Sequence, residues 1–87
     1  MGQKTVVITG GNRGIGLSIT ESFLAAGYSV VVGARDRSSL PVRVIDKITF
    51  VPVDVSKEDD HIKLVDTALK ITGNLDCFIN NAGFSEW

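Results

Sequence analysis

The residues best suited to chemistry lie in a glycine-rich segment near the N-terminus, Thr9 to Gly16. Gly10 permits a tight turn, Gly14 lets the backbone approach a ligand, and Gly16 lets a following helix pack closely. If the segment joins a strand to a helix, the free backbone N–H groups at the helix start create a site for a phosphate. The segment therefore predicts phosphate binding, with a plain strand-to-helix turn as the structural alternative.

The spacing of these glycines narrows the class of phosphate ligand. The segment lacks the Gly-Lys-Ser or Gly-Lys-Thr ending of the loop that grips triphosphates, which argues against ATP or GTP hydrolysis. Three residues separate Gly10 from Gly14 and one separates Gly14 from Gly16, so the pattern also differs from the common G-x-G-x-x-G fingerprint. The spacing separates this turn from both of those families.

Hydrophobic runs predict the elements that hold the turn. Mostly β-branched apolar stretches are typical of strands buried on both faces, and they occur at residues 5–9, 28–34, 48–53 and 75–79. The linker between the second and third of these strands has only about a dozen residues, including Pro41, which is short for a crossover helix. We expect one irregular turn or a stub of helix there.

Two amphipathic helices are expected between the remaining strands. Gly27 ends the first helix, whose apolar face is formed by Ile15, Ile19, Phe23 and Ala26. Gly73 ends the second helix, whose apolar face is formed by Ile62, Val65, Leu69 and Ile71. Ser56 is the expected cap of the second helix, because its hydroxyl can accept a hydrogen bond from the first backbone N–H groups.

The order of these elements predicts the fold. Strand, helix, strand, short link, strand, helix and strand imply a three-layer α/β fold of the Rossmann type, with right-handed crossovers and a parallel sheet in the order 3-2-1-4. Residues 1–87 are expected to form the N-terminal part of a single doubly wound domain, an incomplete half of it. A chain of 87 residues has no room for a second core.

Polar side chains follow two of the expected strands at the edge where open α/β sheets bind ligands. Asp54 could accept a hydrogen bond from an adenine amino group, or it could cap the next helix. Asn80 and Asn81 end the fourth strand. We expect one of these amides to bridge neighbouring backbone and the other to reach a ribose.

Three segments of the chain resemble the motifs of the short-chain dehydrogenase/reductase family. Thr9 to Gly16 is similar to its cofactor motif, Asp54 and Val55 to the pair that meets the adenine ring, and Asn80 to Gly83 to its second signature. They occur in the family's order over essentially the whole chain, and only the short linker departs from the pattern. The resemblance implies dinucleotide contacts from Gly10, Asn12, Arg13, Gly14, Ile15, Gly16, Arg35, Asp54, Val55, Asn81, Ala82 and Gly83.

The resemblance also bears on which dinucleotide is bound. Ala34 stands where an NAD enzyme of this type places a carboxylate for the ribose hydroxyls. Arg35 follows it, and Arg13 stands in the glycine turn, so two guanidinium groups can meet a 2′-phosphate. This arrangement predicts NADP (NADPH), with NAD as the less favoured cofactor. The alternatives are that Asp36 only neutralises a solvated Arg35, or that Asp36 itself holds the ribose.

The catalytic residues that the resemblance implies, a Ser and a Tyr-x-x-x-Lys segment, are not found in the chain. Tyr28 has Val32 rather than a lysine four residues later, and His61 is expected to be a surface or capping residue. No catalytic residue and no metal site can be assigned. Three hypotheses follow for residues 1–87. They are part of a complete NADP-dependent oxidoreductase that acts on a small carbonyl or alcohol, or a non-catalytic dinucleotide-binding module, or a truncated product that pairs with other chains.

Composition limits the partners and the location. A net charge of −1 gives no general attraction to nucleic acid or to anionic lipid, and no apolar stretch is long enough to span a membrane. Cys77 has no second cysteine to pair with and is expected to be a small buried hydrophobe. A cytoplasmic location, a homo-oligomer and association with the remaining part of the fold are expected. The uncovered fourth strand predicts that the isolated chain aggregates or is only marginally folded.

Overall fold

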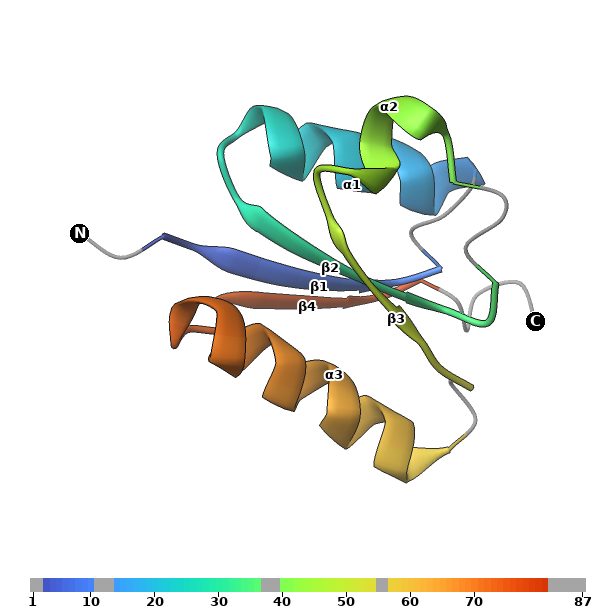
Figure 1. Ribbon diagram of the computed structural model, residues 1–87, viewed down its shortest axis with the longest axis vertical. Coiled ribbons are helices and arrows are strands. Elements are labelled where there is room, and N and C mark those ends of the chain that lie inside the picture. Colours follow the sequence, from blue (N-terminus) through green and yellow to red (C-terminus); the bar gives the residue numbers. More distant parts are fainter. Residues whose placement is uncertain (1–2, 11–13, 37–39, 55–56, 82–87) are drawn as a thin grey trace.

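The elements of the chain alternate between strands and helices in a computed structural model, in which we describe residues 3–10, 14–36, 40–54 and 57–81. In chain order they are β1 (Thr5–Thr9), α1 (Gly14–Ala25), β2 (Ser29–Ala34), α2 (Val42–Ile45), β3 (Thr49–Pro52), α3 (Glu58–Thr72) and β4 (Cys77–Asn80). Figure 1 shows α1 and α2 on one face of the sheet and α3 on the other. These are the three layers that the sequence predicts.

The sheet has four parallel strands in the order β3-β2-β1-β4. In the centre of the register, Val7 of β1 faces Val31 of β2 on one side and Phe78 of β4 on the other. The predicted fold class and strand order are confirmed. Since β1 and β2 lie inside the sheet and are covered on both faces, their continuous apolar sequence is what such strands require.

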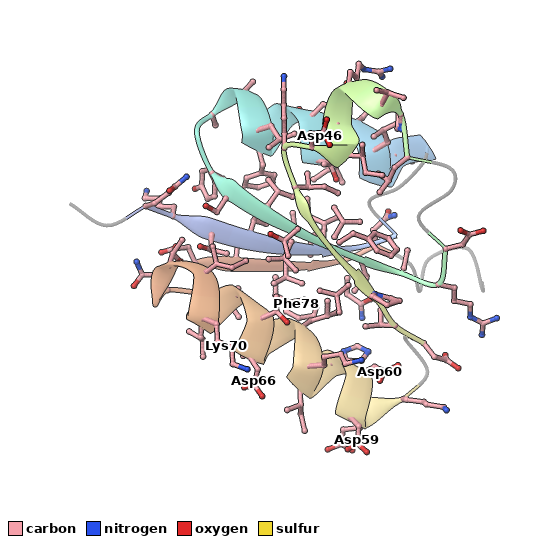
Figure 2. All side chains as sticks on the ribbon, in the orientation of Figure 1. Asp46, Asp59, Asp60, Asp66, Lys70 and Phe78 are labelled. Carbon is pink, nitrogen blue, oxygen red and sulfur yellow. The ribbon has the colours of Figure 1, made fainter. Side chains whose placement is uncertain are left out.

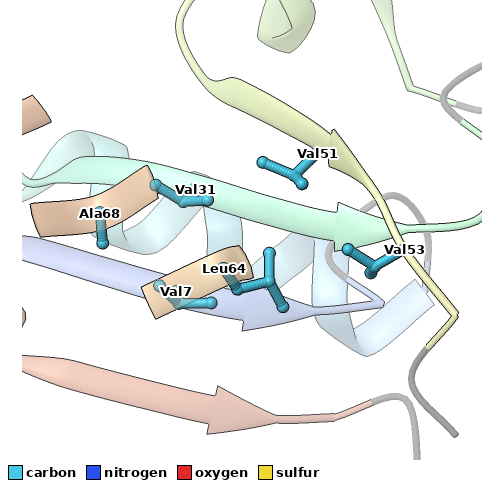
Figure 3. Close-up of a cluster of buried hydrophobic side chains, with 6 residues drawn as sticks. All are labelled: Val7, Val31, Val51, Val53, Leu64 and Ala68. Atoms are coloured by element: carbon cyan, nitrogen blue, oxygen red, sulfur yellow. The ribbon is translucent and has the colours of Figure 1, made fainter. Parts of the chain in front are cut away.

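Alternate residues of the central strands pack on the two faces of the one sheet and form two clusters of buried side chains. One, beneath α3, is drawn in Figure 3 and consists of Val7, Val31, Val51, Val53, Leu64 and Ala68. The other, beneath α1, consists of Val6, Ile8, Val30 and Val32. Half-buried residues, including Cys77, pack against the second cluster, so the expectation that Cys77 is buried is only partly met.

Helix α1 packs on the sheet through a face shifted from the predicted one. Ile19 and Phe23 contact the core as expected, but Ile15 is 75% exposed and Ala26 is exposed just beyond the end of the helix. The buried helical positions are Gly16 and Thr20. Successive residues turn by about 100°, so Ile15 projects well to one side of the direction in which Gly16 faces. The prediction was wrong for Ile15 and Ala26.

Gly16 sets how closely α1 approaches the sheet. A Cβ atom placed there would lie 2.0 Å from the carbonyl oxygen of Gly10 and 2.7 Å from Nδ2 of Asn81. The carbonyl belongs to the backbone and cannot rotate away as a side chain could. The close packing predicted for Gly16 is therefore confirmed, and only glycine fits at this position.

The linker between β2 and β3 contains the short helix α2, as the sequence predicts. Val44 and Leu40 are its buried anchors. Arg43 Nε lies 2.9 Å from Glu21 Oε2 of α1, and this hydrogen bond raises the pKa of the Arg43 guanidinium. Helix α2 is thus held against α1 on the same face of the sheet (Figure 1).

Helix α3 buries a different face from the predicted one. Leu64 and Ala68 are fully buried, whereas Ile62 is 52% exposed and Leu69 and Ile71 are each 43% exposed. The helix carries two neighbouring apolar stripes, and the periodicity of one does not reveal which of them meets the sheet. Gly73 ends α3 with φ of 82°, as predicted.

The start of α3 also differs from the prediction. The cap position is Lys57, one residue after Ser56, and Lys57 makes no side-chain cap hydrogen bond. Ser56 lies outside the described residues. Asp60, the third residue of the helix, accepts a hydrogen bond from the backbone N–H of Asp54 instead. The acidic first turn therefore secures the connection from β3 through Asp60.

The second apolar stripe of α3 lies over the side of the sheet that ends in β4. The His61 ring stacks on Phe78 of β4, with ring centroids 6.1 Å apart and an interplanar angle of 8°. Helical geometry places Val65, Leu69 and Ile62 progressively further around the helix on the His61 side of the buried face. The exposed stripe of α3 consists of Ile62, Val65 and Leu69, in which Ile62 and Leu69 are exposed and Val65 is half-buried.

Replacement of Gly16 by alanine should destabilise the fold by about 1–3 kcal/mol or more, because the new methyl group overlaps a backbone carbonyl. The measurement is the free energy of unfolding by urea. Ser18→Ala, at an exposed position of α1, is the matched control and should change it by less than about 0.5 kcal/mol. Equal changes in the free energy of unfolding for Gly16→Ala and Ser18→Ala would contradict the packing described for Gly16.

The exposed stripe of α3 should make the isolated 87-residue chain self-associate. Replacing Ile62 and Leu69 together by lysine should reduce the association measured by analytical ultracentrifugation. Lysines at Ser18 and Ser22 add the same charge to an exposed face of α1 and should reduce it less. A monomeric wild-type chain with a cooperative thermal transition would contradict the prediction.

Candidate functional site

The candidate site residues gather at the carboxyl ends of the strands. All the strands are parallel, so these ends meet along one edge, at the right of Figure 1. The chain leaves β1 toward β2 on one side, while β4 pairs with β1 on the other. Ligands of open α/β sheets bind where the strand order reverses in this way.

The turn after β1 presents backbone to open space. Gly10 and Gly14 have φ of 69° and 61°, values that residues with a side chain rarely adopt. The N–H of Gly10 donates to the Gly33 carbonyl at 2.8 Å, which anchors the turn to β2. A Cβ at Gly14 would meet nothing within 4 Å, so this point beside the start of α1 is unobstructed.

The electrostatics of the turn suit an anion. Helix α1 has 12 residues and no acidic residue in its first turn, so nothing there opposes the positive end of its dipole. Ile15 is exposed at this end of the helix. Unobstructed backbone and a helix N-terminus together fit a phosphate group. The predicted contacts Asn12 and Arg13 lie outside the described residues.

The two asparagines after β4 connect it to the glycine turn. Asn80 Oδ1 accepts a hydrogen bond from the Thr9 hydroxyl at 3.0 Å, and Asn81 Nδ2 donates to the Gly10 carbonyl at 3.4 Å. Both amides therefore contribute to structure, where only one was expected to. The ligand role of Asn81 stays a prediction, and Ala82 and Gly83 lie outside the described residues.

An open depression lies between the ends of β2 and β3. It has a volume of about 340 Å³ and is lined by Arg35, Pro52, Val53, Asp54 and Asp60. Arg35 Nη2 is 3.6 Å from Asp54 Oδ1 across it. The structure thus brings together Arg35, which follows β2, and Asp54, which follows β3, and both were predicted from the sequence. Val55 lies outside the described residues.

Asp60 is the lining residue that the sequence analysis missed. Its Oδ2 accepts the backbone N–H of Asp54 at 2.6 Å, and Figure 2 labels it near the end of β3. The available signal was an acid in the first turn of the helix, a position that favours bonds to backbone N–H groups. The sequence also offers Ser56 as a cap for the same helix, so Asp60 was not assigned a role.

The groups that could serve acid–base or metal chemistry have structural surroundings. Tyr28 packs edge-on against Phe23 with centroids 4.8 Å apart, and His61 stacks on Phe78. Among the described residues, no group of three or more His, Cys, Asp or Glu side chains could hold a metal ion. Nor does any helix in that part of the chain have both the length and the apolar character needed to cross a bilayer.

Comparison with known proteins agrees with the geometry of the site. The family model for short chain dehydrogenase matches residues 4–87. L-fucose dehydrogenase of Bos taurus is 39% identical over 83 residues, which cover 93% of this chain and 31% of that protein. The chain spans about a third of the length of such relatives.

Two solved structures show both cofactors among similar proteins. Actinorhodin polyketide ketoreductase with NADPH superposes with a TM-score of 0.79 at 25% identity, covering 91% of this chain and 33% of that one. A 3-oxoacyl-[acyl-carrier protein] reductase of Brucella melitensis in complex with NAD superposes with a TM-score of 0.78 at 30% identity, covering 95% and 34%. The glycine turn, the strand order and the match over nearly the whole sequence lead to one conclusion: this chain belongs to the short-chain dehydrogenase family.

Proposed function

We propose that residues 1–87 are the cofactor-binding, N-terminal part of the Rossmann domain of an NADP(H)-dependent oxidoreductase. The observation that carries the cofactor preference is Arg35 at the mouth of the depression, directly after Ala34. Because position 34 is alanine, it offers no carboxylate to bind the ribose hydroxyls of NAD. An arginine suits a 2′-phosphate, because its planar donors can bind phosphate through charge-assisted hydrogen bonds.

The residues of the carboxyl edge fit the adenosine and phosphate parts of such a dinucleotide. The unobstructed turn at Gly14 suits the diphosphate, the depression beside Asp54 suits the adenine, and Arg35 suits the 2′-phosphate. When bound, the nicotinamide supplies hydride transfer to a carbonyl or from a secondary alcohol. The part of the protein described here binds and orients the cofactor, and the proton-transferring residues are expected elsewhere.

The exposed apolar surface supports a larger assembly over a free-standing module. Ile62 and Leu69 on α3 and the outer edge of β4 would be covered by further elements of the same fold. Relatives about three times as long provide the room for such elements. Assembly into a homo-oligomer and a cytoplasmic location remain predictions from the sequence.

Arg35→Ala should weaken the binding of NADPH by about tenfold or more and leave that of NADH nearly unchanged, because only NADPH carries the 2′-phosphate. The measurement is the Kd of each dinucleotide, by isothermal titration calorimetry on the complete polypeptide that contains residues 1–87. Arg43→Ala, which removes an exposed arginine of α2, is the matched control and should change neither Kd.

Two outcomes would contradict the proposal in different ways. A wild-type protein that binds neither dinucleotide would exclude the oxidoreductase and the non-catalytic dinucleotide-binding module alike. A preference for NADPH that survives Arg35→Ala would leave dinucleotide binding intact and remove Arg35 as its determinant. Dinucleotide binding with no hydride transfer to any carbonyl would favour the non-catalytic module.

A further inference from the structure

Arg35 and Asp54 lie side by side just beyond the paired ends of β2 and β3. Ala34 pairs with Pro52 in the register of these strands, and the N–H of Val53 then donates to the Ala34 carbonyl at 2.9 Å. Arg35 directly follows Ala34, and Asp54 directly follows Val53. Their 3.6 Å contact is therefore made one residue beyond the last backbone hydrogen bond between the two segments.

The two partners differ in how firmly they are held. The Asp54 side chain is 32% exposed, and its backbone N–H is bonded to the Asp60 carboxylate at 2.6 Å. The Arg35 side chain is 80% exposed. Asp54 is thus the fixed acceptor, and Arg35 is the partner that can turn toward another anion.

We propose that Asp54 competes with the 2′-phosphate for Arg35 and so reduces the preference for NADPH over NADH. This inference rests on the proposed function. Arg35 Nη2 is the nitrogen nearest the Asp54 carboxylate, and a phosphate held by the same nitrogen would have to take it from that ion pair. NADH, which lacks the 2′-phosphate, leaves the pair intact.

The size of the effect follows from the exposure of the pair. Ion pairs open to solvent contribute little, so Asp54 adjusts the preference without abolishing it. Removing the charge should raise the ratio of Kd for NADH to Kd for NADPH about two- to fivefold at low ionic strength. High salt should shrink the change, because it screens exposed charges.

Asp54→Asn is the appropriate variant, since asparagine has nearly the same shape, keeps one side-chain oxygen that can accept a hydrogen bond, and replaces the other oxygen and its charge by a neutral NH2 group. Both Kd values are measured on the complete polypeptide that contains residues 1–87, with the thermal transition as a check of folding. Asp66→Asn removes one carboxylate from the outer side of α3, away from the sheet in Figure 2, and should leave the ratio unchanged.

The same substitution in an Arg35→Ala background identifies the route of the effect. If Asp54 acts through Arg35, Asp54→Asn should no longer change the ratio once Arg35 is absent. An equal rise without Arg35 would show direct repulsion of the phosphate and overturn the proposal. An unchanged or lowered ratio of Kd for NADH to Kd for NADPH in Asp54→Asn, with Arg35 present, would also overturn the proposal.

Failure of the inference can be told apart from failure of the proposed function. A wild-type protein that binds neither dinucleotide overturns both. Selective loss of NADPH binding in Arg35→Ala, together with an unchanged ratio in Asp54→Asn, upholds the proposed function and overturns only the competition by Asp54.

Discussion

The structure depends on the contact between the backbone of α1 at Gly16 and the Gly10 carbonyl. It fixes the helix at a distance that no other residue type allows, and so aims the start of α1 at the end of β1. Asn81 Nδ2 donates to the same carbonyl, which ties the end of β4 to the turn. One close approach of backbone to backbone thus joins three elements and leaves Gly14 facing open space, where a phosphate can reach the first N–H groups of the helix.

A second constraint comes from the paired ends of β2 and β3. Just beyond their last paired residues Arg35 contacts Asp54, and Asp60 accepts a hydrogen bond from the backbone N–H of Asp54 between β3 and α3. In the proposed function, the first constraint serves the diphosphate and the second serves the adenine end of a dinucleotide. The sheet therefore spaces the parts of the site, and the side chains add charge to positions that the backbone already defines.

Local sequence was sufficient where backbone geometry decides the outcome. The glycine spacing, the buried strands and the short linker with Pro41 correctly predicted the turn, the strand order and α2. Local sequence was insufficient where tertiary packing decides which side chains are buried. Leu64 and Ile62 are equally apolar, and only the sheet determines that Leu64 is buried. The position of Asp60 in the first turn of a helix could be read from the sequence, but its partner could not, because that partner is a backbone N–H whose position depends on how the chain folds after β3.

If the carboxyl edge of the sheet binds the adenosine and phosphate parts of NADP, 2′,5′-ADP should bind there, since it carries the 2′-phosphate and a 5′-phosphate without the nicotinamide. The most direct measurement is the amide chemical shifts of the complete polypeptide during titration with 2′,5′-ADP. We expect the largest shifts at Gly14 to Gly16 and at Arg35, and none on the outer side of α3 around Asp66. Saturable binding that shifts α3 and leaves the glycine turn unchanged would contradict it.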